Sequence, residues 1–296
     1  MKCRRFAMLF YFFFFAAAAA RAQAPGVSPA VNQGASGSLE HYLNAAAQYY
    51  VQQEWDNAIE SYTKALRIDP RLTTALLGRG LSYLGKGETD DAIKDFRSLI
   101  KIDPRSLDAF NAHLIQTQIL QKKGDLEGAL AEANQALAIK PKDGLVNNIR
   151  AKLKESKGDL DGALADYDTA ISLLPRNPAF HCNRGVVRRA IGDFEGALAD
   201  FNKALELNPR QAIYMVQRGD TKKSIRNLDG ALADYNQALD WDFSYAPGHV
   251  QRAILELSSG RDAEAQADFD IAVKLDPSLA KAIDEAKAKA TKKRLQ

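Results

Sequence analysis

The stretch "GDFEGALADFNKALELNP" at residues 192–209 recurs almost unchanged elsewhere in the chain. It returns as "GDLDGALADYDTAISLLP" at residues 158–175 and as "GDLEGALAEANQALAIKP" at residues 124–141. Prolines end five such phrases, at spacings of 34, 37, 34 and 34 residues. A fixed period of roughly 20–50 residues is the sequence signature of a solenoid of stacked repeats. The five prolines are Pro70, Pro104, Pro141, Pro175 and Pro209.

Each period predicts two helices joined by a tight turn. In residues 178–211 the first helix is predicted at about 179–191, and Gly192 supplies the left-handed residue that ends it. Asp193 is placed to cap the second helix, and Pro209 ends that helix because a residue before proline avoids the α region. The residues equivalent to Gly192 are Gly87, Gly124, Gly158 and Gly260.

Small and aromatic residues recur at fixed places in these helices. Gly80, Gly185 and Gly219 lie in first helices, where a missing side chain lets the second helix approach closely. The aromatic residues of the second helices, which we interpret as core, are Tyr62, Phe96, Tyr167, Phe201, Tyr235 and Phe269. A further small column, expected to face the following repeat, is formed by Ala65, Ala170, Ala204, Ala238 and Ala272.

This pattern resembles the tetratricopeptide repeat family, in which 34-residue helix–turn–helix units carry Gly or Ala in the first helix and Ala, Phe or Tyr, Ala and Pro in the second. The resemblance implies an all-α fold: a right-handed α-solenoid of seven repeats with a concave groove lined mainly by the first helices. It also implies a capping helix, because the last repeat would otherwise expose its apolar face. The predicted repeats are 39–72, 73–106, 107–143, 144–177, 178–211, 212–245 and 246–279, and the predicted cap is 280–296.

Two repeats depart from the pattern. The repeat at residues 107–143 is three residues longer, and it has Ala133 where the others have Tyr or Phe, which puts its local packing in doubt. The repeat at residues 212–245 has Phe243 in place of the final proline, and Pro247 follows in the next helix start. A local bend is expected there.

Residues 1–22 have the features of a secretory signal. Three basic residues precede an apolar run from Phe6 to Ala20, and "ARA" at residues 20–22 is a small-x-small cleavage site. The run is 15 residues long, whereas a membrane span needs roughly 20. We therefore predict cleavage and export, to a bacterial periplasm or outside the cell; an uncleaved membrane anchor is the alternative. Residues 23–38 carry no charge and are predicted to be a flexible linker.

The charge balance does not favour nucleic-acid binding. The full chain has 40 basic and 37 acidic residues, a net charge of +3. Cleavage would remove four basic residues and no acid, which leaves 36 against 37 and a net charge of −1. We expect no nucleic-acid partner, no membrane contact after cleavage, and a monomer. The one remaining cysteine, Cys182, cannot form an internal disulfide, which fits a bacterial periplasm better than a disulfide-stapled secreted domain.

Arginine and aspartate form two matching columns. The same five repeats carry both residues, 16 positions apart, so we predict a ladder of ion pairs within or between neighbouring repeats. Partly exposed ion pairs contribute only about 0–1 kcal/mol each to stability. We therefore expect these pairs to fix the register between neighbouring helices; the alternative is that the arginines form a basic track for a ligand. The arginines are Arg79, Arg150, Arg184, Arg218 and Arg252, and the aspartates are Asp95, Asp166, Asp200, Asp234 and Asp268.

No catalytic constellation or cofactor motif stands out. The chain has no Gly-rich phosphate loop, no "GxSxG", no "HExxH" and no "CxxC". His113, His181 and His249 are two repeats apart, so they are too distant to share a metal ion and are interpreted as packing residues. Cys182 is interpreted as an inert small apolar residue. We predict no enzyme activity, no cofactor and no metal.

The sequences of the first helices vary more between repeats than those of the second helices. Either the first helices have diverged because they form a binding face, or they vary more because packing constrains them less. We predict a groove with a polar middle and apolar ends that binds a protein or peptide, in a non-enzymatic scaffold. The alternative is a membrane-tethered structural or assembly factor of an envelope complex. The predicted groove residues of this middle part are Asn148, Lys152, Glu155, Asn183, Val186, Arg189, Gln217, Asp220 and Lys223, with Cys182 and Val216 beside them. The predicted apolar ends are Leu77, Leu81 and Leu84, and Val250, Ile254 and Leu257.

Overall fold

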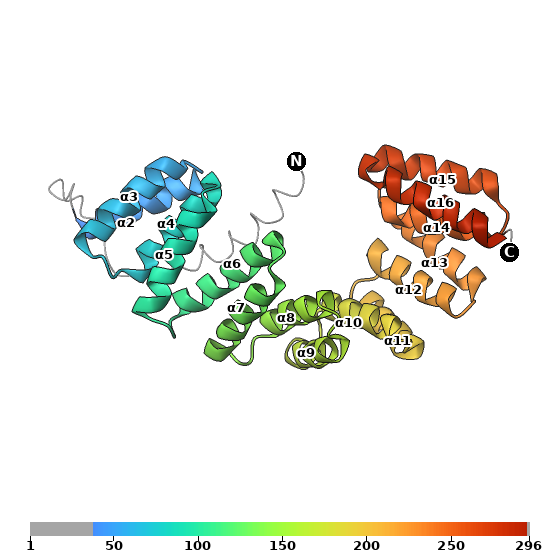
Figure 1. The fold of residues 1–296 in the computed structure, drawn as a ribbon, viewed down its shortest axis with the longest axis horizontal. Helices are drawn as coiled ribbons and strands as arrows, with labels where there is room; N and C mark the ends of the chain where they lie inside the picture. Colours follow the sequence, from blue (N-terminus) through green and yellow to red (C-terminus); the bar gives the residue numbers. More distant parts are fainter. Residues whose placement is uncertain (1–37, 295–296) are drawn as a thin grey trace. The chain divides into compact units, whose positions relative to one another are not determined.

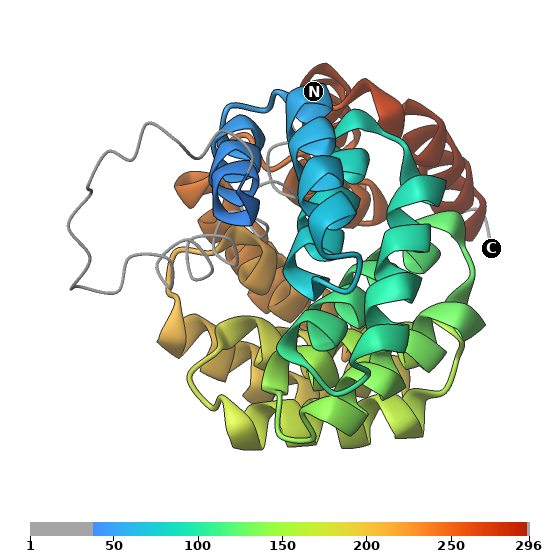
Figure 2. The same cartoon turned by 90° about the vertical axis from the view of Figure 1, so that its left-hand side faces the viewer.

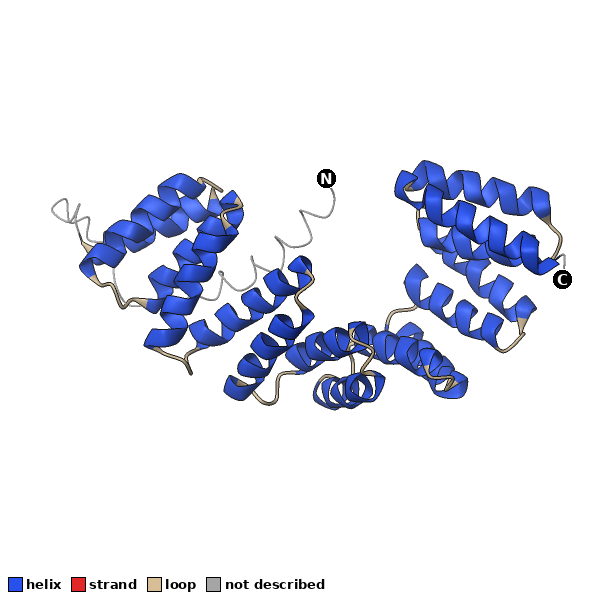
Figure 3. Ribbon diagram, in the orientation of Figure 1, coloured by secondary structure: helices blue, strands red, loops and turns tan. Residues whose placement is uncertain are grey.

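The computed structural model describes residues 38–294, and this part of the chain is built from helices (Figure 1, Figure 3). It contains fifteen α-helices, one short 3₁₀ helix and no β-strand within those residues, which confirms the all-α prediction. The helices are α2 (Leu39–Val51), α3 (Trp55–Ile68), α4 (Thr73–Lys86), α5 (Thr89–Ile102), α6 (Leu107–Lys123), α7 (Leu126–Ile139), α8 (Gly144–Ser156), α9 (Leu160–Leu173), α10 (Pro178–Ala190), α11 (Phe194–Leu207), α12 (Ala212–Ser224), α13 (Leu228–Trp241), α14 (Ala246–Ser258), α15 (Asp262–Leu275), η1 (Pro277–Leu279) and α16 (Ala280–Arg294).

The predicted signal (residues 1–22) and linker (residues 23–38) lie outside the described residues, apart from Ser38. The Ser38 side chain accepts a hydrogen bond from the backbone N–H of His41 and caps α2. None of the described helices combines the length and the apolar character that a membrane crossing requires.

The chain forms two compact units that divide inside α6, between Gln116 and Thr117. Unit 1 contains α2 to α5, and unit 2 contains α7 to α16. In each unit neighbouring helices pack as hairpins, α2 against α3 and α4 against α5 in unit 1, and α8 against α9, α10 against α11, α12 against α13 and α14 against α15 in unit 2 (Figure 2). We call the two members of a hairpin its first and second helix.

The turn inside each hairpin has the left-handed residue that the sequence predicts. Gly192 has φ 85°, and the equivalent glycines have φ between 79° and 95°. Asp193 then caps α11 by accepting a hydrogen bond from the N–H of Gly196 at 2.9 Å. Two turns lack the glycine: Gln53 and Arg226 adopt positive φ values of 62° and 66°, a conformation that is strained for residues with a Cβ.

The core of each hairpin sets a small residue against an aromatic ring. A Cβ built on Gly80 would lie 2.5 Å from a ring carbon of Phe96, and one on Gly219 would lie 2.7 Å from the ring of Tyr235. Larger residues at these positions would force the two helices apart, so the glycines are needed for close packing. All five alanines of the predicted small column have no exposed surface.

The repeat at 107–143 differs in both length and packing. Its three additional residues lengthen the first helix, so that α6 has 17 residues where the other first helices have 13 or 14. Its small and large positions are also exchanged, because buried Thr117 stands where the others have Gly or Ala and buried Ala133 stands where they have a ring. Thr117 therefore fills part of the space that an aromatic ring fills in the other repeats.

Pro247 lies in the first turn of α14, where its missing N–H has no intrahelical partner to lose. It opens the last hairpin. Beyond that hairpin, α16 covers α14, and Ile283 of α16 is buried in a cluster with Ala253, Ala265, Phe269 and Ala272. This packing confirms the predicted capping helix.

Candidate protein-binding face

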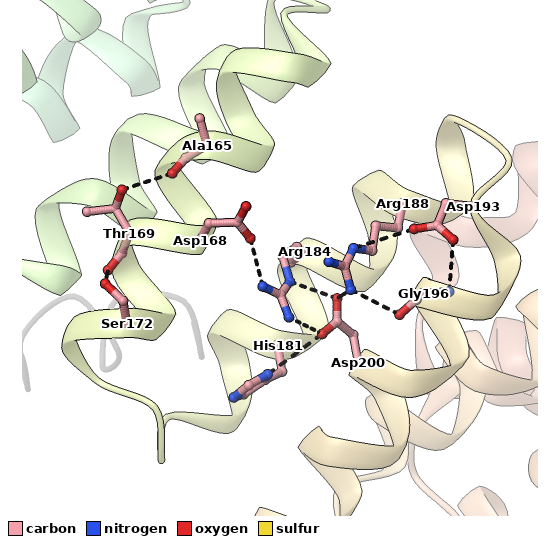
Figure 4. A network of polar contacts seen from close by, with 10 residues as sticks. All are labelled: Ala165, Asp168, Thr169, Ser172, His181, Arg184, Arg188, Asp193, Gly196 and Asp200. Carbon is pink, nitrogen blue, oxygen red and sulfur yellow. Dashed lines mark hydrogen bonds and ion pairs between the residues drawn. The ribbon is translucent and has the colours of Figure 1, made fainter.

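The predicted arginine–aspartate pairs form in all five repeats that carry them. In each repeat Nε and Nη2 of the arginine on the first helix donate to the two carboxylate oxygens of the aspartate 16 residues later, on the second helix. For Arg184 and Asp200 these distances are 2.9 and 2.6 Å (Figure 4). Two parallel bonds of this kind fix the geometry of both side chains.

The same arginines also reach the preceding repeat. Nη1 of Arg184 donates to Asp168 on α9 at 2.7 Å (Figure 4). Nη1 of Arg218 donates to Asn202 on α11 at 2.8 Å. The acceptor is always 16 residues before the arginine, so each guanidinium joins the second helices of two successive repeats. We call this arrangement the clamp. The other acceptors are Thr63, Asn134 and Asn236.

The clamp aspartates are buried, which differs from the partly exposed pairs that the sequence suggested. Asp200 and Asp268 are each only 3% exposed. In three repeats a second cation one turn after the arginine adds a further bond to the aspartate: Lys154 to Asp166 at 2.8 Å, Arg188 to Asp200 at 3.0 Å and Lys222 to Asp234 at 2.9 Å. Burial alone would raise the pKa of Asp166, but the bonds from Arg150 and Lys154 outweigh it and hold that pKa below its usual value. The clamps therefore hold a negative charge in the interior, and removing an arginine would leave that charge undercompensated.

The clamp column is interrupted at Gln116, which stands where the other repeats have arginine. The position of the acceptor on α5 is taken by Arg97, which cannot accept a hydrogen bond. The chain divides into its two units directly after Gln116.

Two histidines form hydrogen bonds with the loops that join successive repeats. Nε2 of His181 lies 3.0 Å from the carbonyl oxygen of Pro175, and Nε2 of His249 lies 2.9 Å from that of Phe243. Both rings are buried, and Nδ1 of His249 also bonds to Asp268 at 2.8 Å. Burial and these bonds are what a packing role requires of both histidines. The described residues contain no group of three metal-ligating side chains.

The last repeat carries a buried carboxylate where three others carry the second cation. Glu256 is 9% exposed, and its Oε2 has no hydrogen-bond partner within the described residues. Burial and the neighbouring charge of Asp268 raise the pKa of Glu256 above its usual value. Glu256 is therefore an unfavourable residue at a position where three other repeats carry a cation.

The polar residues predicted for the groove lie on the first helices of unit 2, where α8 contacts α10, α10 contacts α12 and α12 contacts α14. We call the surface that these four helices share the first-helix face. Several of the predicted residues bond to one another across repeats. Nδ2 of Asn183 donates to Asn148 at 2.9 Å, and Nη2 of Arg189 donates to Gln217 at 2.7 Å.

The network continues toward the last repeat. Nη1 of Arg189 is 3.5 Å from Asp220, and Nζ of Lys223 lies 3.3 Å from Asp220 and 2.8 Å from the side-chain oxygen of Gln251. The hydroxyl of Tyr235 donates to Asp220 at 2.6 Å, and that of Tyr167 donates to Glu155 at 3.0 Å. Burial and these carboxylates raise the pKa of both tyrosines, which keeps the hydroxyl groups protonated as donors.

Lys152 differs from its neighbours on this face. It is exposed, and it makes no side-chain hydrogen bond or ion pair with any described residue. Val186 is half-buried and packs against the core of unit 2. The first-helix face thus presents one free cation beside amide groups whose positions are fixed by cross-repeat bonds.

Several of the predicted apolar groove residues belong to the core instead. Leu81, Cys182 and Val216 are 9%, 5% and 2% exposed, because the helix phase turns them inward. Val250, Ile254 and Leu257 pack against the cluster that α16 closes, so the capping helix takes the place that a partner would need. Leu77 and Leu84 are half-buried. Burial raises the pKa of the Cys182 thiol to about 12, in keeping with an inert residue.

Gln251 was missed by the sequence reasoning. The spacing of the residues could have identified it. Arg189 and Gln217 are 28 residues apart, six fewer than the 34-residue period, and so are Lys223 and Gln251. A polar pair at this spacing joins the end of one first helix to the middle of the next.

Family models of the tetratricopeptide repeat match four segments of the chain. Two models described as "Tetratricopeptide repeat" match residues 178–211 and 77–144, and one described as "TPR repeat" matches residues 46–87 and 155–189. Together these segments cover just over half of the chain. Among curated proteins, none matches the sequence.

Solved structures share the fold at low sequence identity. A tetratricopeptide repeat protein from Parabacteroides merdae is 18% identical with a TM-score of 0.67, covering 86% of this chain and 98% of its own. PilF from Pseudomonas aeruginosa is 22% identical with a TM-score of 0.58, covering 73% and 97%. PilW, described as a widely conserved type IV pilus biogenesis factor, is 21% identical with a TM-score of 0.57, covering 70% and 94%.

Proposed function

The chain belongs to the tetratricopeptide repeat family, and from this premise we propose that it is a non-enzymatic scaffold that binds a protein or peptide in the groove of its first helices. Proteins of this family bind protein partners, and the fold alone does not name the partner. The residues that carry the proposal are those of the first-helix face of unit 2.

The observation that supports the proposal best is the cross-repeat polar network. The amide of Asn183 donates to that of Asn148, and one repeat later the guanidinium of Arg189 donates to the amide oxygen of Gln217. A peptide meeting this face finds donors and acceptors already fixed, so little side-chain entropy is lost on binding. Amide groups suit the backbone of an extended peptide, and Lys152 offers a charge for a carboxylate.

The clamps supply the rigidity that such a face requires. Each guanidinium ties two successive second helices together, from Arg150 to Arg252 in unit 2. Because the second helices are held in register, the first helices that pack on them keep a constant spacing. The partner would then be recognised by shape and hydrogen bonds on a preformed surface.

Capture of a partner from the exported fraction tests the proposal. The bait is residues 23–296, compared with an Asn148→Ala, Lys152→Ala, Arg189→Ala triple variant. The matched control replaces three exposed residues of second helices, Arg97, Gln135 and Lys274, by alanine.

We expect the unchanged bait and the control to retain one partner that the groove variant loses. Equal capture by all three baits would exclude the first-helix face as the binding surface. Circular dichroism of each bait shows whether a loss comes from the surface or from unfolding.

We further propose that the chain is exported and acts after removal of residues 1–22, on the strength of the basic start, the 15-residue apolar run and the "ARA" site. Sequencing the N-terminus of the protein recovered from cell fractions tests this. A mature form that begins at Gln23 in the exported fraction is expected. An intact N-terminus in the membrane fraction would support the membrane-tethered assembly factor instead.

A further inference from the structure

Three loops of unit 2 that join a second helix to the next first helix each carry an exposed cation. Lys142, Arg176 and Arg210 directly follow the prolines that come after α7, α9 and α11. The equivalent residues of unit 1 are also basic and exposed, Arg71 and Arg105, whereas the last two loops have Ser244 and Ser278. The position is therefore basic in five consecutive loops. Such a recurrence is not expected of surface charges placed at random.

These cations are unpaired, unlike those of the clamps. Lys142, Arg176 and Arg210 make no side-chain hydrogen bond or ion pair within residues 38–294. The arginines of the clamps, by contrast, are all bonded to aspartates, and Lys154, Arg188 and Lys222 are bonded as well. The loop cations contribute nothing to the fold, so their charge remains available to an external anion.

An exposed aliphatic residue accompanies each loop cation. Leu145 follows Lys142, Leu174 precedes Arg176, and Ile213 follows Arg210, with exposed fractions of 41%, 42% and 36%. The three loops lie on one edge of the unit, where second helices end and first helices begin. At this edge neighbouring loops touch: a Cβ built on Gly144 would lie 3.1 Å from Cδ1 of Leu174. We call these six residues the junction edge.

The opposite edge of the unit has charges of both signs. The turns inside the hairpins carry exposed Asp159, Asp161, Asp193, Glu195 and Asp229 beside exposed Lys157 and Arg226. The cations of the junction edge have no bonded carboxylate within the described residues, so an anionic ligand is attracted to that edge.

We infer that the junction edge binds an extended acidic segment of a protein partner, in which apolar residues alternate with carboxylates. The repeats are stacked at the spacing of packed helices, about 8–10 Å. A chain in the polyproline II conformation has three residues per turn and rises about 3.1 Å per residue, so a carboxylate at every third residue points the same way and meets one cation per repeat. The apolar residues between the acids then cover Leu145, Leu174 and Ile213. This surface is separate from the first-helix face and does not depend on the function proposed for that face.

A labelled peptide of the required chemistry tests the inference. The probe is fluorescein-labelled "ELSELSELSE", and its control is "KLSKLSKLSK", which has the same apolar content. Binding to residues 23–296 is followed by fluorescence anisotropy at about 0.1 M salt, where the Debye length is about 10 Å. The edge variant is Lys142→Glu, Arg176→Glu, Arg210→Glu.

The control variant makes the same change in charge at three other exposed cations, Lys122→Glu, Lys274→Glu and Lys281→Glu. Circular dichroism and thermal unfolding confirm that both variants are folded. We expect the acidic peptide to bind and the basic peptide not to, with the edge variant weakened by about tenfold or more and the control by less than about twofold.

Three results would overturn the inference: no binding of the acidic peptide, equal binding of both peptides, or equal weakening by both variants. A second arm uses vesicles of phosphatidylcholine with phosphatidylserine. Sedimentation with these vesicles that is lost in the edge variant, without binding of the acidic peptide, would assign the edge to an anionic membrane surface and would contradict a peptide partner.

Discussion

Glu256→Lys is predicted to stabilise the last repeat. In repeats at 144–177 and 212–245 a lysine occupies the same position and bonds to the clamp aspartate at 2.8 and 2.9 Å. Glu256 instead places a second carboxylate, with Oε2 unpartnered, beside buried Asp268. A lysine here removes the unsatisfied oxygen and adds a charged hydrogen bond.

The expected gain follows from these two changes. Leaving a buried polar group unsatisfied costs about 1–3 kcal/mol, and since Glu256 keeps some exposed surface we expect a gain of about 1–2 kcal/mol in the free energy of unfolding. For a chain of this size each kcal/mol raises Tm by about 2–4 °C, which gives about 2–8 °C. Repeat proteins can open locally, so hydrogen exchange of residues 246–294 should slow more than that of the other repeats.

The control is Glu285→Lys, which makes the same change in charge on the exposed surface of α16. It should alter Tm by less than about 1–2 °C, since a surface substitution usually changes stability by no more than about 0.5 kcal/mol. If Glu256→Lys were no more stable than the unchanged chain, the reading of Glu256 as an unsatisfied buried carboxylate would be wrong.

The pH dependence gives a second check on the same residue. Burial and then Asp268 raise the pKa of Glu256 in the folded chain above its ordinary 4.5. The cost of its charge is therefore fully present above the folded pKa, and it disappears as the pH falls through that value toward 4.5. The advantage of Glu256→Lys should be largest near pH 7 and should shrink at acidic pH. A difference in stability that is the same at pH 4 and pH 7 would contradict this cause.

Four further substitutions test the architecture. Arg184→Ala should cost about 1–3 kcal/mol in urea unfolding, because Asp200 stays buried without its bidentate partner; a loss below about 0.5 kcal/mol would show that the clamp has no energetic role. Arg226→Gly should gain about 1 kcal/mol by relieving a positive φ, whereas Gly192→Ala should lose about 1–2 kcal/mol, and effects of the opposite sign would contradict the turn geometry. Ile283→Ala should cost about 2–4 kcal/mol and speed amide exchange in α14, and unchanged exchange there would mean that α16 is no cap.

The periodic features could be predicted from the sequence, because each follows from a residue with one strong local preference. Gly192 and its equivalents mark the turns, Asp193 marks the helix start, and the small–aromatic columns mark the core. The arginine–aspartate pairs were also predictable, since both columns occur in the same five repeats.

The side chains that point outward were harder to place. Helical phase decides whether a residue faces the core or the groove, and an error of one position moves Cys182 and Val216 from surface to interior. The contact of each clamp with the preceding repeat depends on how repeats stack, which a single repeat does not encode. Coverage of Val250 and Ile254 depends on the cap, an element outside the periodic pattern.

Photo-crosslinking in the living cell tests most directly whether the first-helix face is the site of partner binding. A photo-crosslinking amino acid replaces Lys152 on α8 in one strain and exposed Lys274 on α15 in another. Irradiation should yield one discrete protein adduct from position 152 and none from position 274. An adduct from position 274 alone, or the same adducts from both positions, would contradict binding on the first helices.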